Sequence, residues 1–392
     1  MCVTCPAPGT GSPLGNNAKC SSPPPLPLGN LRDVRQQRYT LLENARDLLF
    51  AEGVKLGLQH PANYHRTAQC TRVPFGLNVE IKNSIEHQKA FFNGVIICGS
   101  VWSCPVCSAK IQERRRLEIS MAISKAYSEN LKCIMVTFTF PHTKFNHLND
   151  LLEKQKKAFF YLRSGNVWNK RKTKIGFKGL IRSLELTYGD NGWHPHTHEI
   201  WIVNKDCDVA ALKEKILSRW AFICEKVGLL TENKKSDFLI RAVDVKDNAS
   251  NSDYLAKQDS SKYYWGADRE IAKGSAKSSK GLHPFEFLHH HSEKLSRKKC
   301  EKLFIEYSNS MKGKRQILWS PGLKEWAGIT EKTDEEIAKE KDNISELICL
   351  LTLNEWKIVI KNIAQAEILY RAETGGMLKV MEWFNKVACY NH

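Results

Sequence analysis

The sequence predicts an α+β fold in which an antiparallel sheet carries helices on one face, followed by a helical C-terminal region. Residues 131–142 are rich in branched and aromatic residues, and residues 183–202 form two such runs joined by Gly-Asp-Asn-Gly. Apolar residues at helical spacing fill 147–163 and 207–227, and residues 238–245 are expected to add a further strand. The order strand, helix, hairpin, helix, strand is typical of an antiparallel sheet packed against helices.

The composition limits the classes of protein to consider. The chain has 392 residues, enough for two or three domains, and its 59 Lys and Arg against 42 Asp and Glu give a formal charge of +17. This charge favours a polyanionic partner such as nucleic acid, with membrane association as the alternative. No apolar run approaches the roughly 20 residues that cross a bilayer, and the start lacks a secretion-signal pattern. We therefore expect no membrane partner, and the 13 cysteines indicate reduced thiols or metal ligands in the cytoplasm.

The first region is a leader that is not expected to fold. Residues 1–30 are rich in Pro, Gly, Ser and Asn, a composition that cannot bury a core, so we expect disorder there. Residues 31–58 have apolar residues along one helical stripe. With the segment that follows, they form a predicted helical and zinc-knuckle DNA-binding region at 31–128.

The second region contains a zinc-knuckle pattern. Cys104-x-x-Cys107 has Pro after the first cysteine, and the turn formed by this spacing allows both thiolates to face one Zn²⁺ ion. Cys98 is the expected third ligand and Cys70 the nearest candidate for the fourth, with His60 or His65 as the alternative. The competing interpretation is that these cysteines pack as small apolar residues.

Two basic clusters are candidates for contact with nucleic acid. One follows the knuckle on a predicted helix, and the other lies in a predicted basic loop at 167–179, where Trp168 and Phe177 alternate with cations. Cations interleaved with aromatic residues suit single-stranded DNA, because bases stack on the rings while the cations contact phosphates. The candidate residues are Arg114, Arg115, Arg116, Lys170, Arg171 and Lys172. A solvated helix face explains the arginines equally well.

The hairpin at 183–202 carries the strongest indication of a metal site. If its turn is centred between Asp190 and Asn191, Glu185 lies opposite His196, and Ser183 lies opposite His198. Side chains alternate along a strand, so the three alternate histidines at 194–198 share one face with Glu185. Imidazoles and a carboxylate that converge on a rigid sheet are typical of a divalent-metal site.

The third motif is Tyr254-x-x-Lys257, which we expect on a helix. A spacing of three places both side chains on one helical face. The pKa of a phenol is about 10, so a tyrosine acts as a nucleophile only when its phenolate is stabilised, and Lys257 could contribute to that. Tyr263 and Tyr264 are nearby competitors, and a core aromatic beside a solvated amine is the alternative interpretation.

The region 281–392 is predicted to be helical. After a Lys/Ser/Gly-rich linker at 273–280, Thr333 begins a capping-box pattern with Glu336. Residues 344–386 read as two amphipathic helices broken at Gly375-Gly376, with docking to the core or self-association as the expected role.

Taken together, these motifs resemble those of the rolling-circle plasmid replication initiators, within the HUH endonuclease class. The segments that carry the resemblance are 98–110, 136–142 (VTFTFPH), 192–198 (GWHPHTH), 254–257 (YLAK), 284–288 (PFEFL) and 319–323 (WSPGL). The resemblance extends over about residues 65–340 and rests on the order of the motifs. The chain departs from the family pattern at Thr197, where a bulkier apolar residue is usual, and at Ser250, where some members carry a Glu.

The resemblance implies an HUH endonuclease domain at 129–272 that nicks the replication origin. It implies that Glu185, His196 and His198 hold Mg²⁺ or Mn²⁺, and that Tyr254 forms a 5′-phosphotyrosine with help from Lys257. A host polymerase and helicase would then be partners, and the origin DNA would be bound as duplex and as a single-stranded hairpin. The departure at Ser250 leaves the chemistry of termination open.

Two alternative functions follow from the same residues. One is a non-catalytic, zinc-dependent DNA-binding regulator in which the histidine hairpin is structural. The other is a relaxase or transposase of the same metal fold. Relaxases usually place the tyrosine before the histidine motif, whereas Tyr254 comes after it, and small transposases lack so long a tail.

Overall fold

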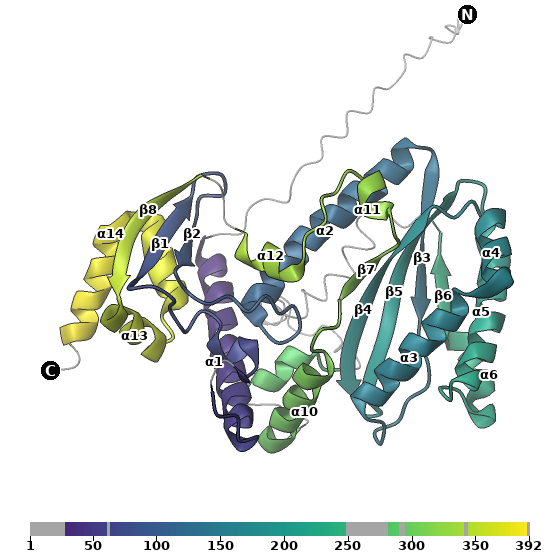
Figure 1. The fold of residues 1–392 in the computed structure, drawn as a ribbon, viewed down its shortest axis with the longest axis horizontal. Helices are drawn as coiled ribbons and strands as arrows, with labels where there is room; N and C mark the ends of the chain where they lie inside the picture. The colour runs from purple at the N-terminus through teal and green to yellow at the C-terminus, as the bar shows by residue number, and fades with distance from the viewer. Residues whose placement is uncertain (1–27, 61–62, 248–280, 290–294, 341–343, 390–392) are drawn as a thin grey trace, which may run out of the picture.

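The computed structural model describes residues 28–60, 63–247, 281–289, 295–340 and 344–389. These residues form an α+β protein with two antiparallel sheets, one of five strands and one of three. Figure 1 shows the larger sheet on the right and the smaller one on the left, with α1 (Leu28–Lys55), α2 (Pro105–Ser128) and α10 (Arg297–Ser310) between them. The α+β class predicted from the sequence is confirmed, and the second sheet was not predicted.

The five-stranded sheet has the order β6-β3-β5-β4-β7. Its strands are β3 (Leu131–Phe138), β4 (Gly179–Gly189), β5 (Gly192–Asn204), β6 (Val243–Lys246) and β7 (Ile317–Trp319). The expected strand at 238–245 is mostly wrong, because α6 (Lys235–Arg241) occupies its first half and only β6 is extended. The apolar run there is too short to distinguish a helix end from a strand by its pattern.

The β4–β5 hairpin has the register predicted from its turn. Glu185 is paired with His196, and Ser183 is paired with His198. Gly192 ends the turn with φ +83°, and a Cβ at this position would lie 2.8 Å from Lys144 Cα. Both the left-handed backbone and the close approach of the loop after β3 therefore require glycine at this position.

Helices cover both faces of this sheet, so the predicted single helical layer is wrong. Apolar residues of α2 pack on a face that includes Met135, Ile200 and Ile202. On the opposite face, Phe138 packs against Phe159 and Trp220. The helices on that side are α3 (Leu148–Leu162), α4 (Gly165–Lys174) and α5 (Val209–Lys226).

The physical reason lies in the strand sequences. β3 and the end of β5 are continuous apolar runs, in which neighbouring residues point to opposite faces, so both faces require cover. On the α2 face, β5 presents His196 and His198 and then Ile200 and Ile202. Ile200 and Ile202 are fully buried, whereas the side chains of His196 and His198 keep 15% and 13% exposure. The histidine half of this face is therefore partly accessible, whereas the isoleucine half is not.

The three-stranded sheet pairs strands that lie far apart in the sequence, because β8 near the C-terminus adds to a hairpin formed by β1 and β2. Its order is β2-β1-β8, with strands β1 (Asn78–Ser84), β2 (Lys89–Asn93) and β8 (Ser345–Thr352). The prediction of helix from residue 344 onwards is wrong for β8, and helices begin only with α13 (Leu353–Lys361) and α14 (Gln365–Cys389). The predicted break in the last helix is confirmed, because Gly375 and Gly376 have non-helical backbone angles.

Short helical elements complete the fold. The capping box at Thr333 and Glu336 is confirmed at the start of α12 (Asp334–Lys339). The remaining short elements are α11 (Leu323–Trp326) and the 3₁₀ turns η2 (Arg66–Gln69), η3 (Glu232–Lys234) and η4 (Pro284–Leu288). Among the described helices, none combines the length and apolar composition needed to cross a bilayer.

Substitution of Gly192 tests the importance of the hairpin turn. We expect Gly192→Ala to lower the thermal midpoint more than Gly313→Ala, whose site has φ +74° but open space around the missing Cβ. Each alanine should lose roughly 1–2 kcal/mol for the left-handed backbone, and the contact with Lys144 should add about 1–3 kcal/mol at Gly192. Equal thermal midpoints for both variants, measured by circular dichroism, would contradict this account of the turn.

Candidate metal centres

A carboxylate and two imidazoles meet on a partly exposed area of the sheet. Glu185 on β4 and His196 and His198 on β5 bring their ligand atoms within 4.8 Å of one another. The distance from Glu185 Oε2 to Nε2 is 3.1 Å for each histidine. Glu185 and His196 are directly opposite each other, and His198 is the diagonal neighbour of Glu185. The predicted register therefore brings all three into one group.

These separations fit a divalent ion. Ligand atoms about 2.1 Å from an ion in octahedral geometry lie about 3.0 Å apart when they are adjacent. The two 3.1 Å separations match this spacing, and the partial exposure of Glu185, His196 and His198 leaves room for further ligands. This group could therefore hold a metal ion and still contact a substrate.

The charge of Glu185 is stabilised by its partners. Burial alone would raise the pKa of this carboxyl group, but hydrogen bonds from His196 and His198 outweigh burial and hold the pKa far below its usual value. Glu185 is therefore an anion that can act as a ligand at neutral pH.

His194 belongs to a different contact. Its Nδ1 lies 2.5 Å from His142 Nε2, and His142 Nδ1 lies 2.9 Å from the carbonyl oxygen of Asn191. Because a carbonyl only accepts, His142 carries its proton on Nδ1 and accepts at Nε2 from His194. Burial, followed by the neighbouring His196 and His142, lowers the pKa of His194 to about 3. The structure therefore places His194 beside the Glu185 group but outside it.

Two histidines at this site were not identified from the sequence as part of it. His142 orients His194, and His283 lies close enough to Glu185 for the carboxylate to influence its charge. Burial lowers the pKa of His283 to about 3, with Glu185 acting in the opposite direction. The hairpin pattern could not reveal either residue, because both come from distant loops.

The segment that carries Tyr254 and Lys257 lies outside the described residues, which end at Asp247 and resume at Gly281. The described residues on either side are both attached to the five-stranded sheet. Before the gap, Asp244 of β6 is paired with Thr137, which is itself paired with His198. After the gap, Leu282 forms a β-bridge with Tyr188, and its N–H donates to the Tyr188 carbonyl at 2.7 Å.

The four predicted cysteines form a second group. Cys70, Cys98, Cys104 and Cys107 are buried, and sulfur–sulfur distances of 3.6 Å (Cys70–Cys107) and 3.7 Å (Cys98–Cys107 and Cys70–Cys104) connect them. Four thiolates at about 2.3 Å from a tetrahedral Zn²⁺ would be about 3.8 Å apart. Cys70 therefore fits the fourth position. The alternative ligand His65 instead accepts a hydrogen bond from the Thr67 N–H through Nδ1.

The surroundings favour the thiolate at Cys98, whereas burial and hydrogen bonds with the other thiols raise the pKa of Cys104 well above its usual value. The Cys98 N–H donates to Cys70 Sγ, and the Cys107 N–H donates to Cys104 Sγ, both at 3.4 Å. Burial alone would raise the pKa of Cys98, but hydrogen bonds from the other three thiols and from the Ser100 N–H hold it well below its usual value.

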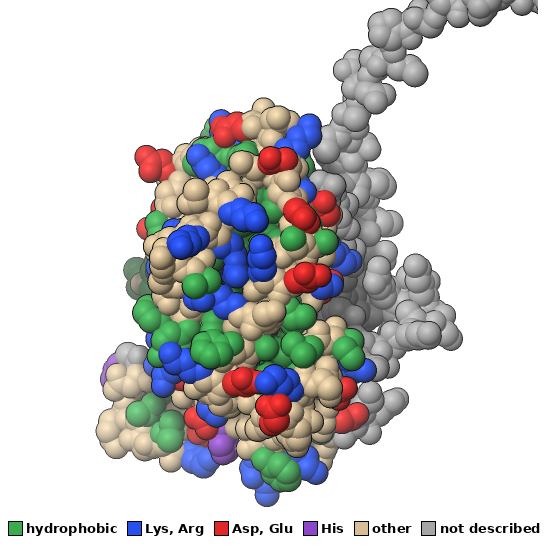
Figure 2. Space-filling model, turned by 90° about the vertical axis from the view of Figure 1, so that its right-hand side faces the viewer, with side chains coloured by type: hydrophobic (Ala, Val, Ile, Leu, Met, Phe, Trp, Pro, Cys, Tyr) green, Lys and Arg blue, Asp and Glu red, His purple; other side chains and the backbone are tan. Residues whose placement is uncertain are grey.

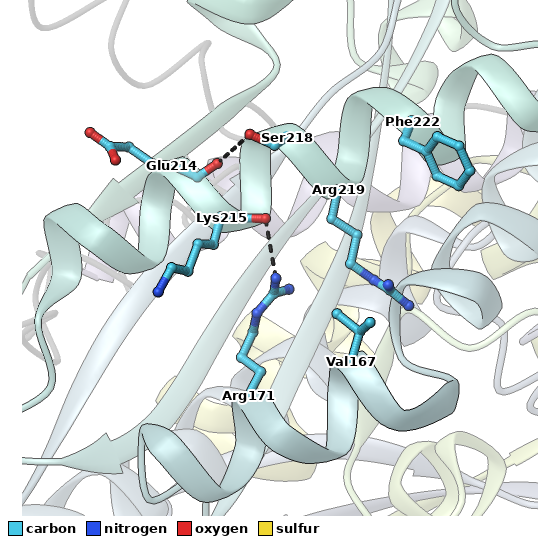
Figure 3. A pocket seen from close by; sticks show the side chains of 7 residues that line it. All are labelled: Val167, Arg171, Glu214, Lys215, Ser218, Arg219 and Phe222. Carbon is cyan, nitrogen blue, oxygen red and sulfur yellow. Dashed lines mark hydrogen bonds between the residues drawn. The ribbon is translucent and has the colours of Figure 1, made fainter.

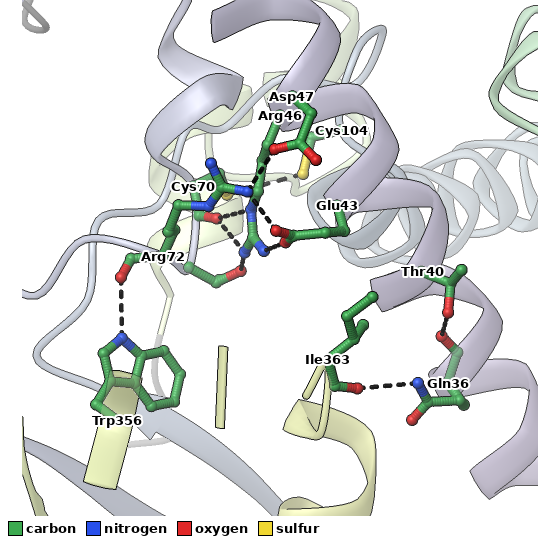
Figure 4. Close-up of polar contacts among 11 residues, drawn as sticks. Gln36, Thr40, Glu43, Arg46, Asp47, Cys70, Arg72, Cys104, Trp356 and Ile363 are labelled. Carbon is green, nitrogen blue, oxygen red and sulfur yellow. Dashed lines mark hydrogen bonds and ion pairs between the residues drawn. The ribbon is translucent and has the colours of Figure 1, made fainter. Parts of the chain in front are cut away.

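A buried arginine connects this group to α1. Arg46 is fully buried, and its Nε donates to the Cys70 carbonyl at 2.8 Å. Glu43 pairs with Arg46 at 2.5 Å, and Trp356 of α13 donates to the Arg72 carbonyl at 2.9 Å (Figure 4). The cysteine group is thus linked through hydrogen bonds to α1 and to the C-terminal helices.

The predicted basic residues of α2 are matched by carboxylates. Arg115 is buried and pairs with Glu118 and Asp334, each at 2.8 Å. Arg116 pairs with Glu113 at 2.5 Å, and Arg114 lies 3.8 Å from Glu118. Arg115 is therefore a structural residue of the α2–α12 contact, and the other two remain exposed candidates for DNA contact.

The second basic cluster lies on a helix, so the predicted loop at 167–179 is wrong for its first part. Lys170, Arg171 and Lys172 belong to α4. Trp168 is 5% exposed and packs edge-on against Trp201, and Phe177 also contacts that ring. Trp168 therefore serves the core and is not available to stack on bases, whereas Phe177 is partly exposed beside Lys172 and remains a candidate for stacking.

The chain is similar to known replication proteins. The chain matches the replication protein family over residues 89–348. It is 25% identical over 354 residues to Protein rep of Streptomyces lividans, covering 71% of this chain and 76% of that protein. A neomycin resistance protein of Streptomyces cyanogenus is 33% identical over 135 residues, which cover 28% of this chain and 31% of that protein. No solved structure matches the chain.

The family match spans more than half of the chain, and it includes both candidate metal groups except Cys70. The relatedness to the Streptomyces lividans protein extends over most of both chains. This chain belongs to the replication protein family.

Proposed function

We propose that the protein initiates rolling-circle replication of a plasmid by nicking one strand at the origin, as an HUH endonuclease with a single catalytic tyrosine. The observation that carries the proposal is the Glu185, His196 and His198 group, whose ligand atoms converge on an accessible part of the sheet. Membership of the replication protein family supports origin DNA as the substrate.

The attachment of the chain on both sides of Tyr254 supports this tyrosine as the nucleophile. Only a few residues separate Tyr254 from β6, and the row of paired residues from Asp244 through Thr137 reaches His198. After the gap, Leu282 pairs with Tyr188 on the hairpin that carries Glu185. From the positions of these flanking residues we infer that the phenol of Tyr254 can reach a phosphate bound at the metal ligands.

The chemistry assigned to these residues is a transesterification. An ion held by Glu185, His196 and His198 would supply Lewis-acid polarisation of the scissile phosphate, and the imidazoles favour Mn²⁺ over Mg²⁺. Tyr254 Oη attacks the phosphorus atom, and the bond between phosphorus and the 3′ oxygen breaks. The departing 3′ oxygen takes up a proton and becomes a free 3′-hydroxyl. Lys257 stabilises the phenolate and the charge that develops. The 5′-phosphotyrosine retains the energy of the broken bond, so the strand can be rejoined later without ATP.

The cysteine group has a structural role in this proposal. Cys70, Cys98, Cys104 and Cys107 would hold Zn²⁺ and fix the start of α2 against α1 and η2. The host polymerase would extend the released 3′-hydroxyl, and a host helicase would separate the strands. A non-catalytic regulator would share the zinc group and bind the origin, but it would form no covalent bond with DNA.

A tyrosine substitution tests the nucleophile. Tyr254→Phe should abolish the covalent protein–DNA band that a labelled single-stranded origin oligonucleotide gives on a denaturing gel, because phenylalanine has no attacking oxygen. Tyr263→Phe and Tyr264→Phe serve as matched controls and should keep the band. A band that persists in Tyr254→Phe and disappears in one of the controls would reassign the nucleophile.

A ligand substitution tests the metal group. His196→Ala should lower the rate of origin nicking by at least about 100-fold, and added Mn²⁺ should not restore it, because a ligand has been removed. The control is His147→Ala, whose side chain is 82% exposed and lies outside the group. Cleavage by His196→Ala at the wild-type rate would eliminate the metal assignment.

Metal analysis tests the cysteine group. Wild-type protein should contain about one equivalent of zinc, and Cys104→Ser should lose it and unfold at a lower temperature. Cys207→Ser changes a buried cysteine outside the group and should keep the zinc. Purified wild-type protein that is folded but contains no zinc would refute the assignment.

A further inference from the structure

A basic surface lies on the side of the sheet opposite Glu185. α4 carries four cations and no acidic residue in the sequence GNVWNKRKTK, and Lys215 of the neighbouring α5 adds another. Figure 2 looks onto this side of the molecule and shows Lys and Arg side chains gathered above a band of hydrophobic ones. Neither metal-binding group uses this surface.

The cations of α4 differ from those of α2 in their partners. Each of the three consecutive arginines on α2 has a carboxylate within 4 Å. Across the described ranges, no ion pair involves Lys170, Arg171, Lys172 or Lys215. The positive charge of α4 is therefore not balanced locally, and an anion would be attracted to it.

Two guanidinium groups enter an open pocket of about 510 Å³ between α4 and α5 (Figure 3). Arg171 donates to the Lys215 carbonyl at 3.2 Å, while its buried Nη1 has no hydrogen-bond partner. Arg219 donates to the carbonyls of Tyr161 at 2.7 Å and Ser164 at 3.0 Å. These acceptors are neutral, and Glu214 points away from both guanidinium groups in Figure 3.

The guanidinium groups of Arg171 and Arg219 repel each other, because no carboxylate pairs with either of them among the described residues. Burial and then the charge of Arg219 lower the pKa of Arg171. An anion between the two guanidinium groups would relieve this repulsion and accept a hydrogen bond from the unpartnered Nη1. The geometry of guanidinium groups suits a phosphate oxygen in particular.

The same pocket has an exposed aromatic wall. Phe222 on α5 is 66% exposed and Val167 on α4 is 53% exposed, although both residues are apolar. Phe222 lies one helical turn beyond Arg219, so a phosphate bound to Arg219 would bring an adjacent base within reach of the ring. A phosphate-binding pair beside an exposed aromatic ring is typical of single-stranded DNA sites.

We propose that the α4–α5 pocket is a second site for single-stranded DNA, in which Arg171 and Arg219 bind one phosphate and an unpaired base stacks on Phe222. The proposal rests on the proposed function, because an initiator that opens its origin must handle a displaced strand. It adds a contact on the opposite side of the sheet, by which the protein can hold that strand while the Glu185 side carries out cleavage.

Binding of a labelled single-stranded oligonucleotide to the full chain, measured by fluorescence anisotropy at several salt concentrations, tests this site. Phe222→Ala should weaken binding by about 5-fold to 100-fold, because the base can no longer stack on the ring. Arg171→Gln with Lys215→Gln should weaken binding and reduce the slope of log K against log salt by about 0.7 for each phosphate that is no longer neutralised. Phe160→Ala, an equally exposed phenylalanine on α3 outside the pocket, is the matched control and should bind normally.

The outcomes separate this site from the proposed function. We expect the pocket variants to keep nicking a short oligonucleotide that covers only the cleavage site, while His196→Ala loses nicking. Wild-type affinity and salt slope in all pocket variants would overturn the second site and leave the nuclease proposal intact. Weaker binding of duplex DNA with unchanged binding of single strands would overturn the assignment to a single strand. Failure of wild-type protein to nick would instead contradict the proposed function.

Discussion

The antiparallel pairing of β4 with β5 is the constraint on which the candidate metal centre depends. A shift of one residue would move Glu185 or the histidines to the opposite face, where Trp201 and Phe138 belong to the core. The tight turn at Gly192 fixes the register, and the loop after β3 packs directly against that turn. This pairing brings Glu185 of β4 together with His196 and His198 of β5 in one ligand group.

The hairpin and the cysteine group could be predicted because residues close together in the sequence determine their geometry. A turn sequence sets the register of two strands, and Cys104-x-x-Cys107 sets the geometry of two thiolates. His283 and His142 could not be predicted in the same way. They reach the site through η4 and the loop after β3, and nothing in their own neighbourhoods indicates where those loops pack.

Errors in the predicted fold have a common physical cause. The pattern of β8 was assigned to a helix because a short apolar run fits both structures, and only its pairing with β1 selects the strand. α4 was expected to be a loop, yet burial of Trp168 against Trp201 fixes it as a helix. In both cases tertiary contacts, which the sequence pattern does not contain, decided the local structure.

The central claim is that Tyr254, in the segment between Asp247 and Gly281, becomes covalently attached to DNA. Mass spectrometry of protein digested after reaction with an origin oligonucleotide in Mn²⁺ tests it most directly. The account predicts a peptide in which Tyr254 carries a 5′-linked nucleotide, present with Mn²⁺ and absent when a chelator is added. Cleaved DNA with no nucleotide on any tyrosine, or an adduct that forms equally well in the chelator, would contradict it.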